Sequence, residues 1–210
     1  MKSPGKSYGK LSIKPSSIPR ELIKVGNTNH NAWIAKVITL FPEIFPGALS
    51  SSLVGKALQD GLWGLETVDL RRFGEGKHRN VDDTPYGGGP GMILRADIME
   101  KAIESAMSEV PKNRKHWPLV YLSPRGERFS QSKAKEWAQG AGITLICGRF
   151  EGLDQRIIDH FSIEEISLGD FILTGGELAA QALIDSTVRL IPRSLGIRNR
   201  LLKKVFKTTC

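Results

Sequence analysis

Short apolar runs alternate with amphipathic helical patterns along most of this chain. The runs have the length and composition of buried strands, and between them apolar residues recur at helical spacing. This alternation predicts an α/β domain with a mainly parallel sheet and helices on both of its faces. Strands are expected at residues 34–40, 65–70, 119–122, 143–147 and 163–168, and helices at 48–62, 96–107, 131–139, 154–161 and 177–191.

The net charge of +8 is concentrated at the two ends of the chain. Residues 1–31 hold six Lys/Arg and one acid, and residues 197–210 hold five Lys/Arg and no acid, so the body carries about −2. The high pI is therefore weak evidence for a nucleic-acid-binding fold. We expect residues 1–31 to be a flexible basic extension, 32–196 the folded domain and 197–210 an atypical basic tail.

Several classes of protein are disfavoured by composition. No run of eighteen or more apolar residues occurs and the N-terminus lacks the apolar stretch of a secretory signal, so we expect a cytoplasmic protein without membrane association. Cys147 and Cys210 are too few for a disulfide framework, and the 4 histidines are too far apart for a local zinc motif. We predict no structural metal.

Four segments rich in glycine or charge are candidates for ligand binding. Residues 78–92 match neither the phosphate-binding P-loop nor the dinucleotide fingerprint, and indicate either an ordered, lid-like loop or a flexible surface loop. Residues 121–126, 147–154 and 167–177 each follow a predicted strand. Because ligands of parallel sheets bind at the carboxyl ends of the strands, these three segments favour a shared site.

Individual residues in these segments allow more than one interpretation. Arg149 and Glu151 either contact a ligand or pair with each other in solvent. Thr174 or Gly176 caps the last helix, with its first turn favouring the acidic Glu177, while the apolar residues before them favour a buried loop lining an adenine pocket.

A buried-type cysteine and a basic cluster also bear on function. Cys147, at a strand end with no histidine nearby in sequence, is interpreted as a small buried hydrophobe rather than a nucleophile. The basic cluster within residues 71–79 is the part of the body that best fits contact with an RNA backbone.

Five segments in one order resemble the bacterial tRNA (guanine-N1)-methyltransferase family. They are residues 38–45, 81–92, 121–126, 147–154 and 168–177, and the resemblance covers about 33–196. The resemblance implies an α/β fold with a C-terminal trefoil knot, a rare exception to unknotted topology, in which S-adenosylmethionine binds bent inside the knot. It also implies a homodimer whose active site is shared between subunits.

The resemblance assigns roles by match to these motifs. The residues expected to bind S-adenosylmethionine are Tyr121, Leu122, Ser123, Pro124, Gly148, Leu168, Gly169, Asp170, Phe171, Ile172, Leu173, Gly175 and Gly176. The residues expected to bind the substrate are Arg149, Asp83, Tyr86, Gly88, Gly89 and Gly91. Glu151 and Arg189 are the expected catalytic residues, Glu151 beside the methyl group and Arg189 in contact with the target guanine.

The implied reaction moves a methyl group from S-adenosylmethionine to N1 of the guanine 3′ of the anticodon in tRNA. Guanine N1 carries a proton at neutral pH, so a base must remove it as the new bond forms. In the family an aspartate does this, and a cationic group stabilises the charge that develops on the guanine oxygen. Magnesium assists the family reaction, but this sequence offers no separate site for it.

Residues 197–210 depart from the family pattern. The family continues there through a linker that contains the aspartate base and then a helical tRNA-binding domain, whereas this chain has a basic segment without a carboxylate. Three hypotheses follow, ranked in this order. The chain is a methyltransferase by descent with weak or no activity, a catalytically inactive dimeric module that binds S-adenosylmethionine, or a scaffold whose basic ends bind polyanions nonspecifically.

Overall fold

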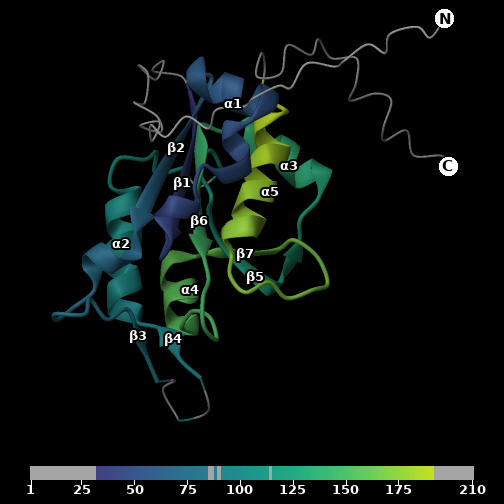
Figure 1. Ribbon diagram of the computed structural model, residues 1–210. Helices are drawn as coiled ribbons and strands as arrows, with labels where there is room; N and C mark the ends of the chain where they lie inside the picture. The colour runs from purple at the N-terminus through teal and green to yellow at the C-terminus, as the bar shows by residue number, and fades with distance from the viewer. Residues whose placement is uncertain (1–31, 85–87, 89–90, 114, 192–210) are drawn as a thin grey trace, which may run out of the picture.

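A five-stranded parallel sheet forms the centre of the molecule in the computed structural model, which describes residues 32–84, 88, 91–113 and 115–191 (Figure 1). The strand order is β2-β1-β6-β5-β7, and each neighbouring pair runs parallel. The strands are β1 (Trp33–Thr39), β2 (Trp63–Asp69), β5 (Leu119–Arg128), β6 (Gly142–Cys147) and β7 (Glu164–Ser167). The predicted α/β class with a mainly parallel sheet is confirmed.

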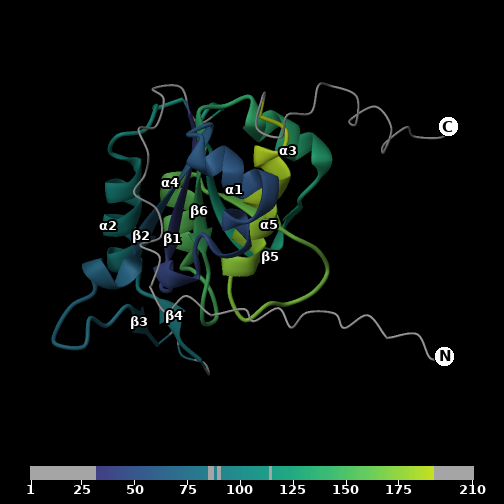
Figure 2. The same cartoon turned by 45° about the horizontal axis from the view of Figure 1, so that its top comes forward.

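Helices cover both faces of the sheet, as predicted (Figure 2). One face carries α1 (Ser52–Gln59), α3 (Gln131–Ala138) and α5 (Glu177–Val188), and the other carries α2 (Ala96–Met107) and α4 (Gln155–Phe161). Alternate residues of β5 divide between the two cores. Val120 and Leu122 pack with Trp137 of α3, whereas Leu119 and Tyr121 pack with Ile98 of α2. This period of two follows from the pleat of a strand buried on both faces.

The first predicted helix is shorter than expected. Residues 48–62 divide into a 3-10 turn, Gly47–Ser50, and the helix α1. The backbone of Ser51 is extended, with φ −103° and ψ 157°, and Ser52 has φ +56°, so the two turns cannot join into one helix. Apolar spacing alone therefore overestimated this element. Two further 3-10 turns, Pro42–Ile44 and Leu70–Phe73, follow β1 and β2.

Two short strands that the sequence did not predict lie within and directly after the segment 78–92. Strands β3 (Asp82–Asp83) and β4 (Ile93–Leu94) pair antiparallel, with Asp82 opposite Leu94. We call this pair the ribbon. Each strand has only two residues, which is too short for periodicity to reveal. The predicted basic ends, residues 1–31 and 197–210, lie outside the described residues.

Candidate functional site

A cavity of about 390 Å³ opens at the ends of β6 and β7 and beside the part of β5 where its pairing with β6 stops. Its walls come from residues 121–125, 148–153, 165–168 and 171–176, together with parts of α4 and α5. The volume is that of a small-molecule site, and the carboxyl ends of parallel strands are the usual place for one. The three strand-end segments singled out in the sequence therefore meet in one cavity.

A bulge in β5 forms one wall of the cavity. Leu122 and Glu127 both pair with Ile166, so the residues between them bulge out of the ladder. At Gly126 a Cβ atom would lie 2.4 Å from the backbone of Glu165 and Ile166, so only glycine permits this close approach. The hydroxyl of Ser123 accepts a hydrogen bond from the amide of Arg125. The bulge places residues 123–125 on the cavity wall.

Gly148, which directly follows β6, lies against Tyr121 of the neighbouring strand β5. A Cβ atom on Gly148 would come within 2.8 Å of the tyrosine ring and its hydroxyl. Tyr121 is 6% exposed, and burial, reinforced by the negative charge of Glu165, raises the pKa of its phenol. The phenol therefore stays neutral, and any side chain at position 148 would have to displace it.

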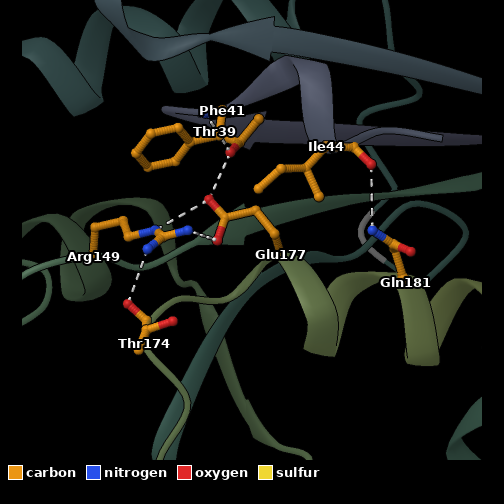
Figure 3. Close-up of polar contacts among 7 residues, drawn as sticks. All are labelled: Thr39, Phe41, Ile44, Arg149, Thr174, Glu177 and Gln181. Atoms are coloured by element: carbon orange, nitrogen blue, oxygen red, sulfur yellow. Dashed lines mark hydrogen bonds and ion pairs between the residues drawn. The ribbon is translucent and has the colours of Figure 1, made fainter. Parts of the chain in front are cut away.

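An ion pair between Arg149 and the buried Glu177 lies next to Gly148 (Figure 3). The Nη2 atom of Arg149 donates to Oε2 of Glu177 at 2.7 Å, and Nε donates to Oε1 at 3.4 Å. The hydroxyl of Thr39, at the end of β1, donates to the same Oε1 at 2.8 Å. Glu177 is only 1% exposed, so its charge is compensated entirely by these donors and by the helix terminus where it lies.

The guanidinium of Arg149 is held on further sides. Its Nη1 atom donates to the carbonyl of Thr174 at 3.1 Å, and its Cζ atom lies 4.5 Å from the centre of the Phe41 ring. Figure 3 shows the guanidinium between Glu177 and Thr174, with the ring of Phe41 beside it. The alternative in which Arg149 pairs with Glu151 is not what the structure shows, because its carboxylate partner is Glu177.

Glu151 faces the glycine-rich segment. Its amide donates to the carbonyl of Met92 at 2.8 Å, and a Cβ atom on Gly91 would lie 2.6 Å from its Cγ. A bridge between Leu94 and Leu153 joins the ribbon to the same turn. The ribbon is therefore attached at the rim of the cavity, beside an exposed carboxylate that belongs to the lining.

The cavity contains most of the residues predicted for S-adenosylmethionine. Those on its lining are Tyr121, Leu122, Ser123, Pro124, Gly148, Leu168, Phe171, Ile172, Leu173, Gly175 and Gly176. Gly169 and Asp170 lie in the same turn but outside the lining. That turn is closed by the Ser167 hydroxyl, which donates to the carbonyl of Gly169.

The residues predicted to bind substrate are only partly brought to the cavity. Arg149 lines it, and Gly91, with φ +95°, contacts Glu151 at its rim. Asp83 and Gly88 are exposed in and beyond the ribbon. Tyr86 and Gly89 lie outside the described residues.

Arg189 is far from the cavity of its own chain. It is the C-cap of α5, whereas Glu177, beside the cavity, begins that helix. A helix of 12 residues separates them, or about 18 Å at the usual rise per residue. The structure therefore does not bring the two predicted catalytic residues, Glu151 and Arg189, together within one chain.

Several functional residues escaped the sequence reasoning. Arg125, Phe150 and Glu165 line the cavity. Arg125 lies within the segment 121–126 that was expected to bind a ligand, so its place in the cavity could have been predicted. Glu177 was assigned only to the first turn of its helix, with Thr174 or Gly176 as the cap, and the N-cap is Gly176. Its ion pair joins residues 28 positions apart, which no local pattern reveals.

Cys147 is buried, as predicted, with 2% of its surface exposed. Burial, together with the negative charge of Glu177, raises the pKa of its thiol well above the usual value. Within the described part of the chain no group of three or more His, Cys, Asp or Glu side chains could hold a metal ion. None of the described helices is long and apolar enough to cross a membrane.

Comparison with known proteins gives one consistent family. A profile of the family described as tRNA (Guanine-1)-methyltransferase TrmD matches residues 33–210. A tRNA (guanine-N(1)-)-methyltransferase of Cereibacter sphaeroides (strain KD131 / KCTC 12085) is 66% identical over 165 residues, which are 79% of this chain and 66% of the relative. The proteins of the same name from Ruegeria sp. (strain TM1040) and Rhodopseudomonas palustris (strain BisB18) are 65% and 51% identical, over 66% and 67% of their own lengths. The chain thus spans about two thirds of these relatives.

Proposed function

The chain belongs to the tRNA (guanine-1)-methyltransferase family, and from that premise we propose that it transfers a methyl group from S-adenosylmethionine to N1 of the guanine 3′ of the anticodon in tRNA. The observation that carries the proposal is the cavity at the ends of β6 and β7 and beside the bulge of β5, where three motif segments meet. We place the reaction in the cytoplasm, where its tRNA substrate is found.

The cavity fits S-adenosylmethionine in size and in chemistry. Leucine side chains offer apolar surface for an adenine ring, and the lining includes the backbone of Gly148, Gly175 and Gly176, where no side chain covers the peptide groups. Glu151 and Glu165 on the lining suit the positive charges of the ligand. When bound, S-adenosylmethionine supplies a methyl group made electrophilic by the sulfonium.

Glu151 is the proposed proton acceptor within this chain. It is an exposed carboxylate on the cavity lining, and carboxylates accept protons in general base catalysis. Arg149, beside it, is proposed to contact the substrate guanine. Its guanidinium has five N–H groups, of which three are used by Glu177 and Thr174, so donors remain for a ligand.

Arg189 is proposed to act in the cavity of a second copy. Its distance from the cavity of its own chain supports a homodimer in which each active site combines residues of both subunits. In the same homodimer the apolar side chains of Phe171, Ile172 and Leu178, which are 54%, 86% and 62% exposed, would be covered.

The cofactor segments are proposed to form a trefoil knot. Their close interleaving supports this: a Cβ atom on Gly175 would lie 2.3 Å from Nε of Arg149, which belongs to a different segment. The amide of Gly176 also donates to the carbonyl of Gly148 at 3.1 Å. Such threading would hold the cavity walls in a fixed relation before any ligand binds.

The ribbon and the basic cluster are the proposed contacts for tRNA. Around the turn that leads to β3, the side chains of this cluster are all exposed: Arg71, Arg72, Lys77, His78 and Arg79. Phosphate contacts of this kind position an RNA without reading its sequence. Among the described residues no group of His, Cys, Asp or Glu side chains fits a magnesium ion.

Binding of S-adenosylmethionine tests the cofactor part of the proposal. Gly148→Arg should reduce the affinity at least a hundredfold, because a side chain there meets Tyr121 at 2.8 Å and fills the cavity. Isothermal titration calorimetry measures the effect. Ser105→Arg, on the exposed side of α2, adds the same side chain away from the cavity and should bind as the parent does. Unchanged affinity in Gly148→Arg would mean that the cofactor binds elsewhere.

A further inference from the structure

We propose that Glu177 determines the charge selectivity of the cavity, so that the cationic methyl donor is preferred over its neutral product. The inference rests on the proposed function, since it concerns the ligand of that same cavity. Glu177 itself does not line the cavity, whereas Arg149, its partner, does. Glu177 therefore acts through Arg149 and is a positioning residue rather than a catalytic one.

The charges around the cavity balance without Glu177 and become negative with it. The charged side chains on the described lining are Arg125, Arg149, Glu151 and Glu165, two of each sign. Glu177, 2.7 Å behind Arg149, adds one negative charge and brings the site to −1. Removing that charge would leave the guanidinium of Arg149 as an uncompensated cation at the wall.

The two ligands of a methyltransferase differ by one charge. S-adenosylmethionine carries a sulfonium, an ammonium and a carboxylate, and is therefore +1 at neutral pH. S-adenosylhomocysteine has a thioether in place of the sulfonium and is neutral overall. A site of −1 attracts the first more strongly than the second, and this helps exchange the spent product for a new donor.

The geometry shows that this ion pair is built into the fold. Glu177 accepts from both Arg149 and Thr39, so its charge is fixed in place by two strand ends. At Gly175 a Cβ atom would lie 2.4 Å from Cζ of Arg149 and 2.6 Å from Oε2 of Glu177, so a side chain there would have to displace the ion pair. The bidentate contact keeps the guanidinium plane in one orientation, which a lysine could not do.

The test compares the affinities of both ligands in Glu177→Gln. The amide is nearly isosteric but neutral, so binding of S-adenosylmethionine should weaken about tenfold more than binding of S-adenosylhomocysteine, the order expected for one charge acting across a partly screened site. Glu66→Gln is the matched control. It breaks an ion pair with Lys36, between β2 and β1, and should leave the affinity ratio unchanged.

A second pair of variants, made in a protein that lacks the Arg149 guanidinium, separates the effect of the Glu177 charge from the effect of its packing. Arg149→Gln leaves Glu177 uncompensated and should shift the ratio in favour of S-adenosylmethionine, and adding Glu177→Gln should cancel that shift. If Glu177→Gln alone fails to fold, the comparison of Arg149→Gln with the double variant still tests whether the Glu177 charge sets the ratio of the two affinities. Equal weakening of both ligands, with no shift in the ratio in either background, would overturn the inference while leaving the proposed function intact. A parent protein that bound neither ligand would instead overturn both.

Discussion

Tyr121 illustrates how one side chain serves both the core and the cavity. Its ring packs with Ile98 of α2 in one core, while its hydroxyl lies 2.8 Å from where a side chain on Gly148 would begin. The sequence placed both residues in the cofactor site through their strand-end motifs. It gave no indication that they touch, because the contact depends on the pairing of β5 with β6.

Burial of Tyr121 has a consequence for stability at high pH. Its pKa is raised in the folded state, so above about pH 10 the unfolded chain loses a proton that the folded chain keeps. The free energy of unfolding therefore falls as the pH rises above that value. In Tyr121→Phe this part of the decline should disappear, which urea denaturation between pH 8 and pH 11 would reveal. A decline as steep in the variant as in the parent would mean that Tyr121 ionises freely in the fold.

The ion pair of Arg149 with Glu177 could not be predicted from the individual residues. Arg149 was predicted to lie at the site, and it does line the cavity. Its two proposed partners were a ligand and Glu151, which is close to it in sequence, whereas the observed partner, Glu177, follows 28 residues later. A buried carboxylate at a helix start looks the same in sequence as an exposed one favoured by the helix dipole.

At the scale of elements, β5 is the strand that departs most from its prediction. Residues 119–122 were expected, and the strand runs Leu119–Arg128 through a bulge. The proline and glycine at 124 and 126 ended the apolar run, which is why the continuation was missed. By contrast, the predicted helix at 96–107 has the observed bounds of α2, because its apolar spacing is regular and no glycine interrupts it.

The bulge of β5 should be intolerant of any side chain at position 126. In Gly126→Ala the new methyl group would lie 2.4 Å from the backbone of β7, so the two strands must separate. We expect a loss of about 2–4 kcal/mol in the free energy of unfolding and a parallel loss of affinity for S-adenosylmethionine.

Chemical denaturation and calorimetry measure the two effects of Gly126→Ala. Glu127→Ala, at the next and exposed position, is the control and should change stability by less than about 0.5 kcal/mol. A Gly126→Ala protein as stable as the parent would show that the strands do not approach each other this closely.

At the scale of the whole molecule, the proposed homodimer makes a quantitative prediction. Gly148→Arg removes the cofactor site and Arg189→Ala removes the proposed contact to guanine, so each protein alone should be inactive. If each active site combines both subunits, a mixed dimer keeps one intact site. Random mixing should then restore about a quarter of the parental methyl transfer, because half of the dimers are mixed and each has one working site of two.

Complementation is measured by mixing the two variants under conditions that exchange subunits. A mixture of Gly148→Arg with Gly148→Arg/Arg189→Ala is the control, and it should stay inactive because no cofactor site is intact. Failure of the first mixture, in a sample shown to contain mixed dimers, would place Arg189 outside the partner's active site.

The fold class and the location of the site were accessible from sequence for a physical reason. Buried parallel strands leave continuous apolar runs, and their ligand-binding ends leave glycine and charge immediately afterwards. Features of a second kind left no such mark: the strands of the ribbon are too short for a periodic pattern, the split of residues 48–62 depends on the backbone angles of Ser51 and Ser52, and the partner of Glu177 is distant in sequence. The proposed knot belongs to this second kind, because it is a property of the path of the whole chain.

The central claim is methyl transfer to a defined guanine. The most direct measurement is incorporation of labelled methyl from S-adenosylmethionine into an unmodified tRNA with guanine 3′ of the anticodon, beside a matched tRNA with adenine at that position. The account predicts label in the first tRNA, recovered as 1-methylguanosine, none in the second, and loss of transfer in Glu151→Gln. No transfer to either tRNA, by a protein that binds S-adenosylmethionine, would contradict it.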